Sequence, residues 1–144
     1  MKPKLLFDRG ERTWALIFDT GDEVVSGLQH FAKEHKPRSA HFTAIGAFRD
    51  ATIAYFDWQS KKYQDIPLTE QVEVLMLAGD VAWKHDGEPV VHAHVVLGRS
   101  DGSTRGGHLK QAHVRPTLEV VLEEYPTHLE RKPDPASGIA LIRV

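Results

Sequence analysis

The sequence lacks cysteine over its whole length of 144 residues. Without thiols, the chain cannot form disulfide bonds, thiolate zinc sites or iron–sulfur clusters, and it has no cysteine nucleophile. Any bound metal must therefore be held by nitrogen and oxygen ligands.

Long hydrophobic runs are absent as well. No stretch of eighteen apolar residues occurs, so no membrane-spanning helix is predicted. The first residues also lack the long apolar segment of a secretion signal, because Asp8 and Arg9 follow Phe7. We therefore expect a cytoplasmic protein with no membrane partner.

An excess of basic charge is also missing, because 18 Lys and Arg are balanced by 20 Asp and Glu, for a net charge of -2 with histidine neutral. Duplex DNA normally binds to a broad positive surface. The pairs Lys61–Lys62 and Arg131–Lys132 are isolated in the sequence and are expected on solvated turns. Specific DNA binding is therefore not predicted, although an oligomer would gather copies of one pair into a weak basic patch.

The length and the 41% hydrophobic content suit one compact domain, which would bury roughly 70% of its unfolded surface. No internal repeat, low-complexity tract or long Pro/Gly/Ser-rich linker divides the chain. Residues 1–144 are therefore predicted to form a single domain.

One segment has helical periodicity. Residues 20–23 read Thr-Gly-Asp-Glu, which is the T-x-x-E form of a capping box. Apolar residues then recur at helical spacing until Pro37: Val24, Val25, Leu28, Phe31 and Ala32. This pattern predicts one amphipathic helix over about residues 21–35.

Most of the remaining chain is rich in β-branched and aromatic residues separated by Gly, Asp, Pro or Ser. The predicted strands are residues 12–19, 39–48, 51–58, 70–83, 89–97, 115–124 and 138–144. Most connections are too short for crossover helices, so neighbouring strands should pair antiparallel. The predicted class is α+β, with a twisted, partly closed, mainly antiparallel sheet packed against one helix.

Residues 72–78 are apolar at most even-numbered and most odd-numbered positions, so both sides of this strand are mainly apolar. This pattern indicates a central strand that is covered on both faces. A single helix cannot cover both faces of such a sheet. The pattern therefore indicates that a partner subunit covers the second face.

The nine histidines of the chain include His92 and His94, which lie two apart in a predicted strand. Side chains two apart on a strand share a face, so both imidazoles can reach one ion. His108 follows after a predicted turn at residues 100–103, which would return the chain beside the same strand. Gly106 and Gly107 would let the backbone take a positive φ or approach closely, placing His108 at a tight corner.

Three histidines with one open position form a familiar zinc arrangement, although imidazole also binds copper, iron, nickel or manganese. The alternative is that these histidines have a structural role without a metal, because imidazoles also cap loops and form hydrogen bonds with carbonyl groups. His113 is an alternative ligand, but a partly exposed role suits it better. The remaining histidines are scattered and are expected on a helix face, on turns or at the surface: His30, His35, His41, His85 and His128.

Two carboxylates, Glu73 and Glu119, lie inside apolar strand segments, where an unpaired buried charge would be costly. They occupy either the solvent face of an alternating strand or a functional position. In the second case, either one would orient a ligand histidine or act as a general base beside metal-bound water. A cupin-type site is disfavoured, because the chain has no glutamate between His94 and Glu119.

The order of these motifs resembles the plant-and-prokaryote-conserved (PPC) domain family. The resemblance is carried by the H-x-H, G-G-H and P-T-x-E-V motifs, supported by A-I-G-A-F and by an F-E-I-L-like core strand: residues 88–98, 101–102, 106–109, 114–120, 44–48 and 72–75. The resemblance therefore extends over most of the chain and implies a compact α+β domain that forms a homotrimer through its sheet.

The resemblance also implies a metal, usually described as zinc, at His92, His94 and His108. In plants the domain is joined to an AT-hook with an R-G-R-P core, which carries the DNA binding. This sequence has no such hook, and residues 70–73 (Glu-Gln-Val-Glu) replace the plant G-R-F-E motif. Because of these two differences, the DNA binding and the partner recognition of the plant proteins are not predicted for this chain.

Three functions follow from these observations. The first is a trimeric metal-binding domain that assembles with, or recognises, a small molecule or a protein. The second is a metal-dependent enzyme that uses a metal-activated water near Glu73 or Glu119. The third, which rests on family analogy alone, is a DNA-binding regulatory protein.

Overall fold

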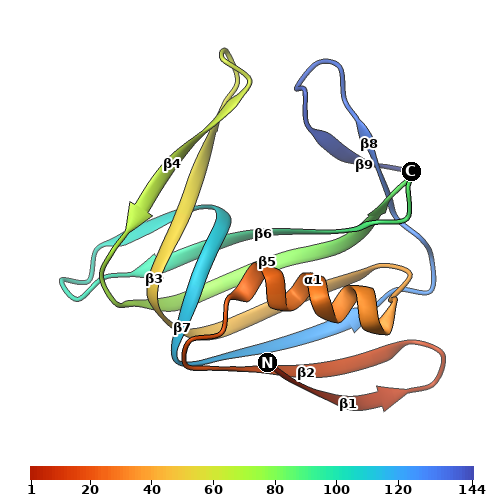
Figure 1. Cartoon of the computed structure of the whole chain (residues 1–144), viewed down its shortest axis with the longest axis horizontal. Coiled ribbons are helices and arrows are strands. Elements are labelled where there is room, and N and C mark those ends of the chain that lie inside the picture. The colour runs from red at the N-terminus through yellow and green to blue at the C-terminus, as the bar shows by residue number, and fades with distance from the viewer.

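The computed structural model describes residues 1–144 and contains nine strands in one sheet together with one helix (Figure 1). The elements in chain order are β1 (Lys2–Asp8), β2 (Arg12–Asp19), α1 (Val24–His35), β3 (Ala40–Asp57), β4 (Lys62–Leu68), β5 (Val72–Lys84), β6 (Pro89–Gly98), β7 (Thr104–Glu124), β8 (Glu130–Pro133) and β9 (Ala140–Arg143). All strand pairs are antiparallel except β5 with β8. The predicted α+β class with a mainly antiparallel sheet is confirmed.

The sheet closes on itself through four of its strands. Strand β3 pairs with β5 and β7, and β6 pairs with the same two strands, so β3, β5, β6 and β7 form a ring. Strands β3 and β7 have 18 and 21 residues, long enough for their two halves to pair with different neighbours. In Figure 1 the β3–β4 hairpin and the β8–β9 hairpin rise to the left and right above β6.

Two predicted strand boundaries are wrong. The predicted strands 39–48 and 51–58 form one continuous strand, β3, because Asp50 stays in the ladder opposite His113 at an irregular register. The polar residues Arg49 and Asp50 therefore mark a β-bulge within one strand, and not a loop between two strands. The predicted strand 115–124 is only the C-terminal half of β7, whose first half includes the glycine doublet.

Three strands were not predicted at all, and each lacks an alternating apolar pattern. Strand β1 is exposed at every position, and β4 is polar and exposed over most of its length. Strand β8 has only four residues and ends in proline. All three are held by pairing with a neighbouring strand rather than by a buried face of their own.

The helix begins later than predicted, and the predicted cap at Thr20 is wrong. Thr20 donates its hydroxyl hydrogen to the carbonyl oxygen of Pro116, whereas Glu23 is the N-cap and accepts from the backbone N–H groups of Val25 and Ser26. Glu23 keeps an extended backbone because it forms a β-bridge with His113. The C-terminal end agrees with the prediction, since the helix ends at His35.

Glu23 allows a test of this cap by pH. Burial alone would raise the pKa of its carboxyl, but hydrogen bonds from Ser26, Val25 and Ala112 outweigh that effect and hold the pKa below its ordinary value. A depressed pKa stabilises the fold above the unfolded-state pKa, and this contribution is lost as pH falls through the folded-state pKa. In metal-free protein, Glu23→Gln should cost about 1 kcal/mol at pH 7.

The free-energy gap between wild type and Glu23→Gln should then shrink as pH falls below about 4.3, the ordinary pKa of glutamate. Urea unfolding at several pH values measures this gap. Glu34→Gln is the control, because Glu34 is exposed on the same helix. A gap that stays constant down to acid pH would contradict this account of the cap.

The helix buries one face against the sheet. Its buried residues Val24, Leu28, Phe31 and Ala32 belong to a core cluster of 27 residues. With 12 residues, α1 is too short to span a membrane, and the chain has no other helix.

The opposite side of the sheet presents apolar side chains to solvent. On β5, Val74 and Leu77 are buried, whereas Leu75 and Met76 are 52% and 49% exposed. We call the following set the apolar outer face: Ile45, Leu75, Met76, Val96 and Val121. The predicted cover on both faces of β5 is therefore present on only one face in the single chain.

Candidate metal centre

The structure brings three histidines together. His92 and His94 alternate along β6 with Ala93 and Val95, which point into the core. His108 on β7 lies directly opposite His94 in the antiparallel ladder. One ring nitrogen from each histidine lies within 4.8 Å of the other two. The ring centroids are 5.1 to 5.6 Å apart, so the rings surround a shared space.

The connection between β6 and β7 explains this convergence. The predicted turn is present, with the Gly102 N–H donating to the carbonyl oxygen of Arg99 and with Asp101 accepting from Ser103. The turn starts an antiparallel ladder that places His108 beside His94.

The glycine doublet acts by close approach alone. Neither Gly106 nor Gly107 has a positive φ, and both lie inside β7, so the predicted tight corner at His108 is wrong. A Cβ atom on Gly107 would lie 2.7 Å from the carbonyl oxygen of Ala54. Glycine therefore lets β7 approach β3 at the residue that precedes His108.

The electrostatics of the site favour the neutral forms of His94 and His108. Burial, together with the charges of His92 and His94, lowers the pKa of His108 to about 4. Burial and the nearby His92 also lower the pKa of His94. Both rings are therefore neutral at pH 7, which is the form that binds metals.

The donor set fits a metal ion. Nδ1 of His108 is buried and has no hydrogen-bond partner, which is costly for a ring nitrogen unless another group satisfies it. His94 is the most exposed of the three rings, and this leaves the cluster open to solvent on one side. Three imidazole nitrogens with an open side match the ligand set of a zinc site that keeps a position for water or a ligand.

Two neighbours of the cluster are not evident from the sequence. Asp80 lies opposite His92 in the β5–β6 ladder, and its Oδ2 atom is 3.4 Å from His92 Nδ1. Its Oδ1 atom accepts a 2.6 Å hydrogen bond from Arg131 on β8. Burial would raise the pKa of Asp80, but the contacts with His92 and Arg131 hold it below its ordinary value. The ring of Tyr63, on β4, packs 4.8 Å from that of His108.

The other predicted candidates lie outside the cluster. Glu73 and Glu119 are both exposed on strand faces, and neither is hydrogen-bonded to a histidine of the cluster. Glu119 lines a shallow cavity beside Ile45 and Met76. His113 is partly exposed and lies 2.7 Å from Asp50, so it is engaged away from the other histidines.

The remaining histidines have separate environments. His30 and His85 are exposed beside glutamates, and His41 contacts Glu123. His35 is the last residue of α1, in agreement with the helix-face prediction, and its ring packs against those of Trp14 and Phe31. His128 is exposed in the loop before β8.

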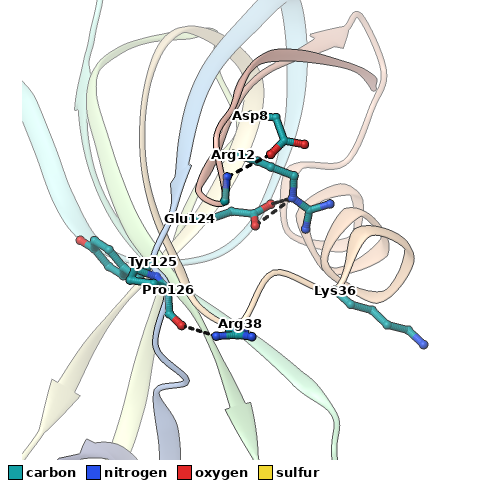
Figure 2. A pocket seen from close by; sticks show the side chains of 8 residues that line it. Asp8, Arg12, Lys36, Arg38, Glu124, Tyr125 and Pro126 are labelled. Carbon is teal, nitrogen blue, oxygen red and sulfur yellow. Dashed lines mark hydrogen bonds and ion pairs between the residues drawn. The ribbon is translucent and has the colours of Figure 1, made fainter.

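A polar cavity of about 420 Å³ lies elsewhere, between the start of β2 and the end of β7 (Figure 2). Arg12 pairs with Glu124 across it, and Glu124 also accepts a 2.8 Å hydrogen bond from Trp14. Arg38 donates to a backbone carbonyl, and Lys36 extends away. The principal carboxylate of this cavity is therefore already satisfied within the chain, and none of the three clustered histidines lines it.

The sequence model of the Plants and Prokaryotes Conserved (PCC) domain matches residues 7–126. The chain belongs to this family. The match ends before β8 and β9, so the C-terminal hairpin lies outside the matched PCC region.

Solved structures from several organisms share this PCC fold. A plant- and prokaryote-conserved protein from Pyrococcus horikoshii is 35% identical, with a TM-score of 0.86 over 99% of this chain and 95% of its own. A metal-containing protein from Archaeoglobus fulgidus is 34% identical, with a TM-score of 0.84 over 100% and 99% of the two chains. A Ralstonia eutropha protein, whose name proposes DNA binding, is 28% identical, with a TM-score of 0.84 over 91% and 90%.

One relative is a longer protein. The bifunctional protein GlmU of Synechococcus sp. (strain JA-3-3Ab) is 31% identical over 141 residues. The match includes 95% of this chain but only 21% of GlmU. The PCC chain therefore spans about a fifth of that relative.

Proposed function

We propose that this PCC-domain protein binds one zinc ion per chain at His92, His94 and His108, and that the ion organises a recognition site for a small molecule or a protein. The observation that carries the proposal is the convergence of three histidine nitrogens within 4.8 Å. The buried Nδ1 atom of His108, which has no hydrogen-bond partner, also supports the proposal, and the Archaeoglobus relative is described as metal-containing.

Zinc suits these ligands better than calcium or magnesium, which prefer oxygen. When bound, zinc supplies a Lewis acid that polarises a coordinated oxygen. The chain supplies the neutral imidazoles and keeps one side open. A ligand with an oxygen or nitrogen donor would enter from that side.

The proposal predicts that untagged protein, purified without chelator, retains close to one divalent ion per chain by elemental analysis. Because the metal binds the folded chain, added zinc should also raise the free energy of unfolding, by about 2.7 kcal/mol when free zinc is 100 times Kd. EDTA should reverse this gain. Protein that carries no metal, and that gains no stability from zinc, would refute the proposal.

The assembled form that we propose is a homotrimer. The apolar outer face supports it, since exposed apolar side chains that cluster on one surface are typical of interfaces. Burial of these side chains against a second copy would also supply the missing cover over β5.

Sedimentation is expected to give three times the 16.2 kDa chain mass. Met76→Glu, which places a charge in the centre of the apolar outer face, should dissociate the trimer because an unpaired charge would be buried. Leu6→Glu is the matched control, since Leu6 is equally exposed but lies on the edge strand β1. A wild-type protein that stays monomeric at micromolar concentration would refute the trimer.

An enzymatic role is the alternative, with a metal-activated water and Glu73 or Glu119 as base. Neither carboxylate contacts the clustered histidines, so we favour recognition.

Specific binding of duplex DNA is not part of the proposal. Lys61 packs its ammonium 3.3 Å from the ring of Trp58. The predicted solvated turn at Arg131–Lys132 is wrong, because both residues belong to β8 and the side chain of Arg131 is buried.

A further inference from the structure

The C-terminal hairpin reaches the metal centre through one buried arginine. Strand β8 pairs in parallel with the end of β5, where Arg131 lies opposite Lys84, four residues after Asp80. The side chain of Arg131 is only 6% exposed, although it belongs to a short polar strand. Its position lies outside the residues that match the PCC family.

The contacts of Arg131 form a chain that ends at a candidate ligand. One terminal nitrogen of the guanidinium donates to Asp80 Oδ1 at 2.6 Å, and the other donates to the carbonyl oxygen of Ala140 at 3.2 Å. The second oxygen of Asp80 lies 3.4 Å from His92 Nδ1. A carboxylate in this place can fix the ring orientation of a ligand histidine and the tautomer that leaves its other nitrogen free for the ion.

Stability alone does not account for this arginine. Its Nε atom is buried without a hydrogen-bond partner, which costs free energy. Buried ion pairs contribute little net stability compared with apolar residues of similar size. An arginine that is partly unsatisfied, yet aimed at the carboxylate beside His92, indicates a role at the site.

We propose that Asp80 and Arg131 are positioning residues of the metal centre: Asp80 orients His92, and Arg131 holds Asp80 in place from the C-terminal hairpin. This inference rests on the proposed metal function. It adds that the hairpin is part of the site and that Arg131 acts only through Asp80.

The experiment uses the full-length protein with zinc(II) and cobalt(II) as probes. Zinc affinity is measured by competition with a chelating dye, and the visible absorption of bound cobalt reports the ligand geometry. Asp80→Asn and Arg131→Met should each weaken zinc binding about 10- to 100-fold, which is typical for groups that support a ligand. Both should also change the cobalt spectrum. The double variant should bind zinc no more weakly than Asp80→Asn alone.

Arg143→Met is the matched control. Arg143 lies in the same hairpin and pairs with Asp134, away from the histidines. This control should keep wild-type affinity and the wild-type cobalt spectrum, even if its melting temperature falls. Arg131→Lys, which keeps the charge, should restore part of the affinity lost in Arg131→Met.

Three results would overturn the inference while wild-type protein still binds zinc. The first is unchanged affinity and cobalt spectrum in Asp80→Asn and Arg131→Met. The second is a double variant whose loss equals the product of the two single losses, because Arg131 would then act independently of Asp80. The third is an equal loss in Arg143→Met, which would assign the effect to the fold of the hairpin. Wild-type protein that binds neither ion would instead refute the metal function itself.

Discussion

Replacing His94 with alanine should remove the metal from the protein. The bound metal is expected to fall from about one ion per chain to near zero, because two histidine nitrogens are fewer than the three protein ligands of open zinc sites. His94 is the most exposed of the three rings. Its loss should therefore leave the fold intact, and elemental analysis of the folded variant measures the effect.

The control for this variant is His113→Ala. His113 is partly exposed and belongs to β7, as His108 does, but its ring contacts Asp50 instead of the cluster. This control should retain the metal. If His94→Ala protein keeps its full metal content, or if His113→Ala loses as much, the assignment of the three ligands is wrong.

The core of this site was predictable from the sequence because its geometry is local. Two histidines spaced by one residue on a strand share a face, whatever the rest of the fold does. His108 was within reach of prediction because a turn-forming segment lies between it and His94. The three ligand candidates therefore needed only strand alternation and one hairpin.

The surroundings of the site were not predictable in this way. Asp80 and His92 meet through the register of β5 with β6, which no short motif specifies. Arg131 reaches Asp80 through a parallel pairing between strands far apart in the sequence. In the sequence alone, Arg131 is one member of a basic pair in a polar segment, and such residues are usually exposed. Contacts that depend on the register of strands distant in the sequence could therefore not be predicted from local patterns.

The same limit explains the errors in the fold. Alternation and composition identified the strands that contribute to the core, whereas β1 and β4 are held by edge pairing and have little buried surface. The helix start shifted because Glu23 pairs with β7, which outweighs the local capping motif. Tertiary pairing thus overrode local signals at the places where the two disagreed.

Gly46 is the position where a single methyl group should have the largest effect on stability. It lies in β3 where the register shifts against both β5 and β7, and its φ is +150°. A Cβ atom there would lie 2.3 Å from the carbonyl oxygen of Thr117 and 2.8 Å from Leu118 Cα. Both are backbone atoms of β7, so no side-chain rotation can relieve the contact.

Gly46→Ala should therefore destabilise the protein by about 3 kcal/mol or more, since backbone strain and overpacking each cost about 1–3 kcal/mol. Urea unfolding of metal-free protein, with the midpoint and slope measured together, gives the value. Gly87→Ala is the control, because Gly87 also has a positive φ, +82°, but has open space around its Cβ position. That variant should lose only about 1–2 kcal/mol, the usual cost of a left-handed residue.

The difference between the two alanine variants isolates the contact between β3 and β7. This contact closes the ring of four strands that carries the histidines, because β7 must approach β3 closely while its other half pairs with β6. Gly46→Ala should consequently also weaken zinc binding, whereas Gly87→Ala should not. If the two variants lose equal stability, the close approach at Gly46 does not constrain the fold, and strand closure must depend on other contacts.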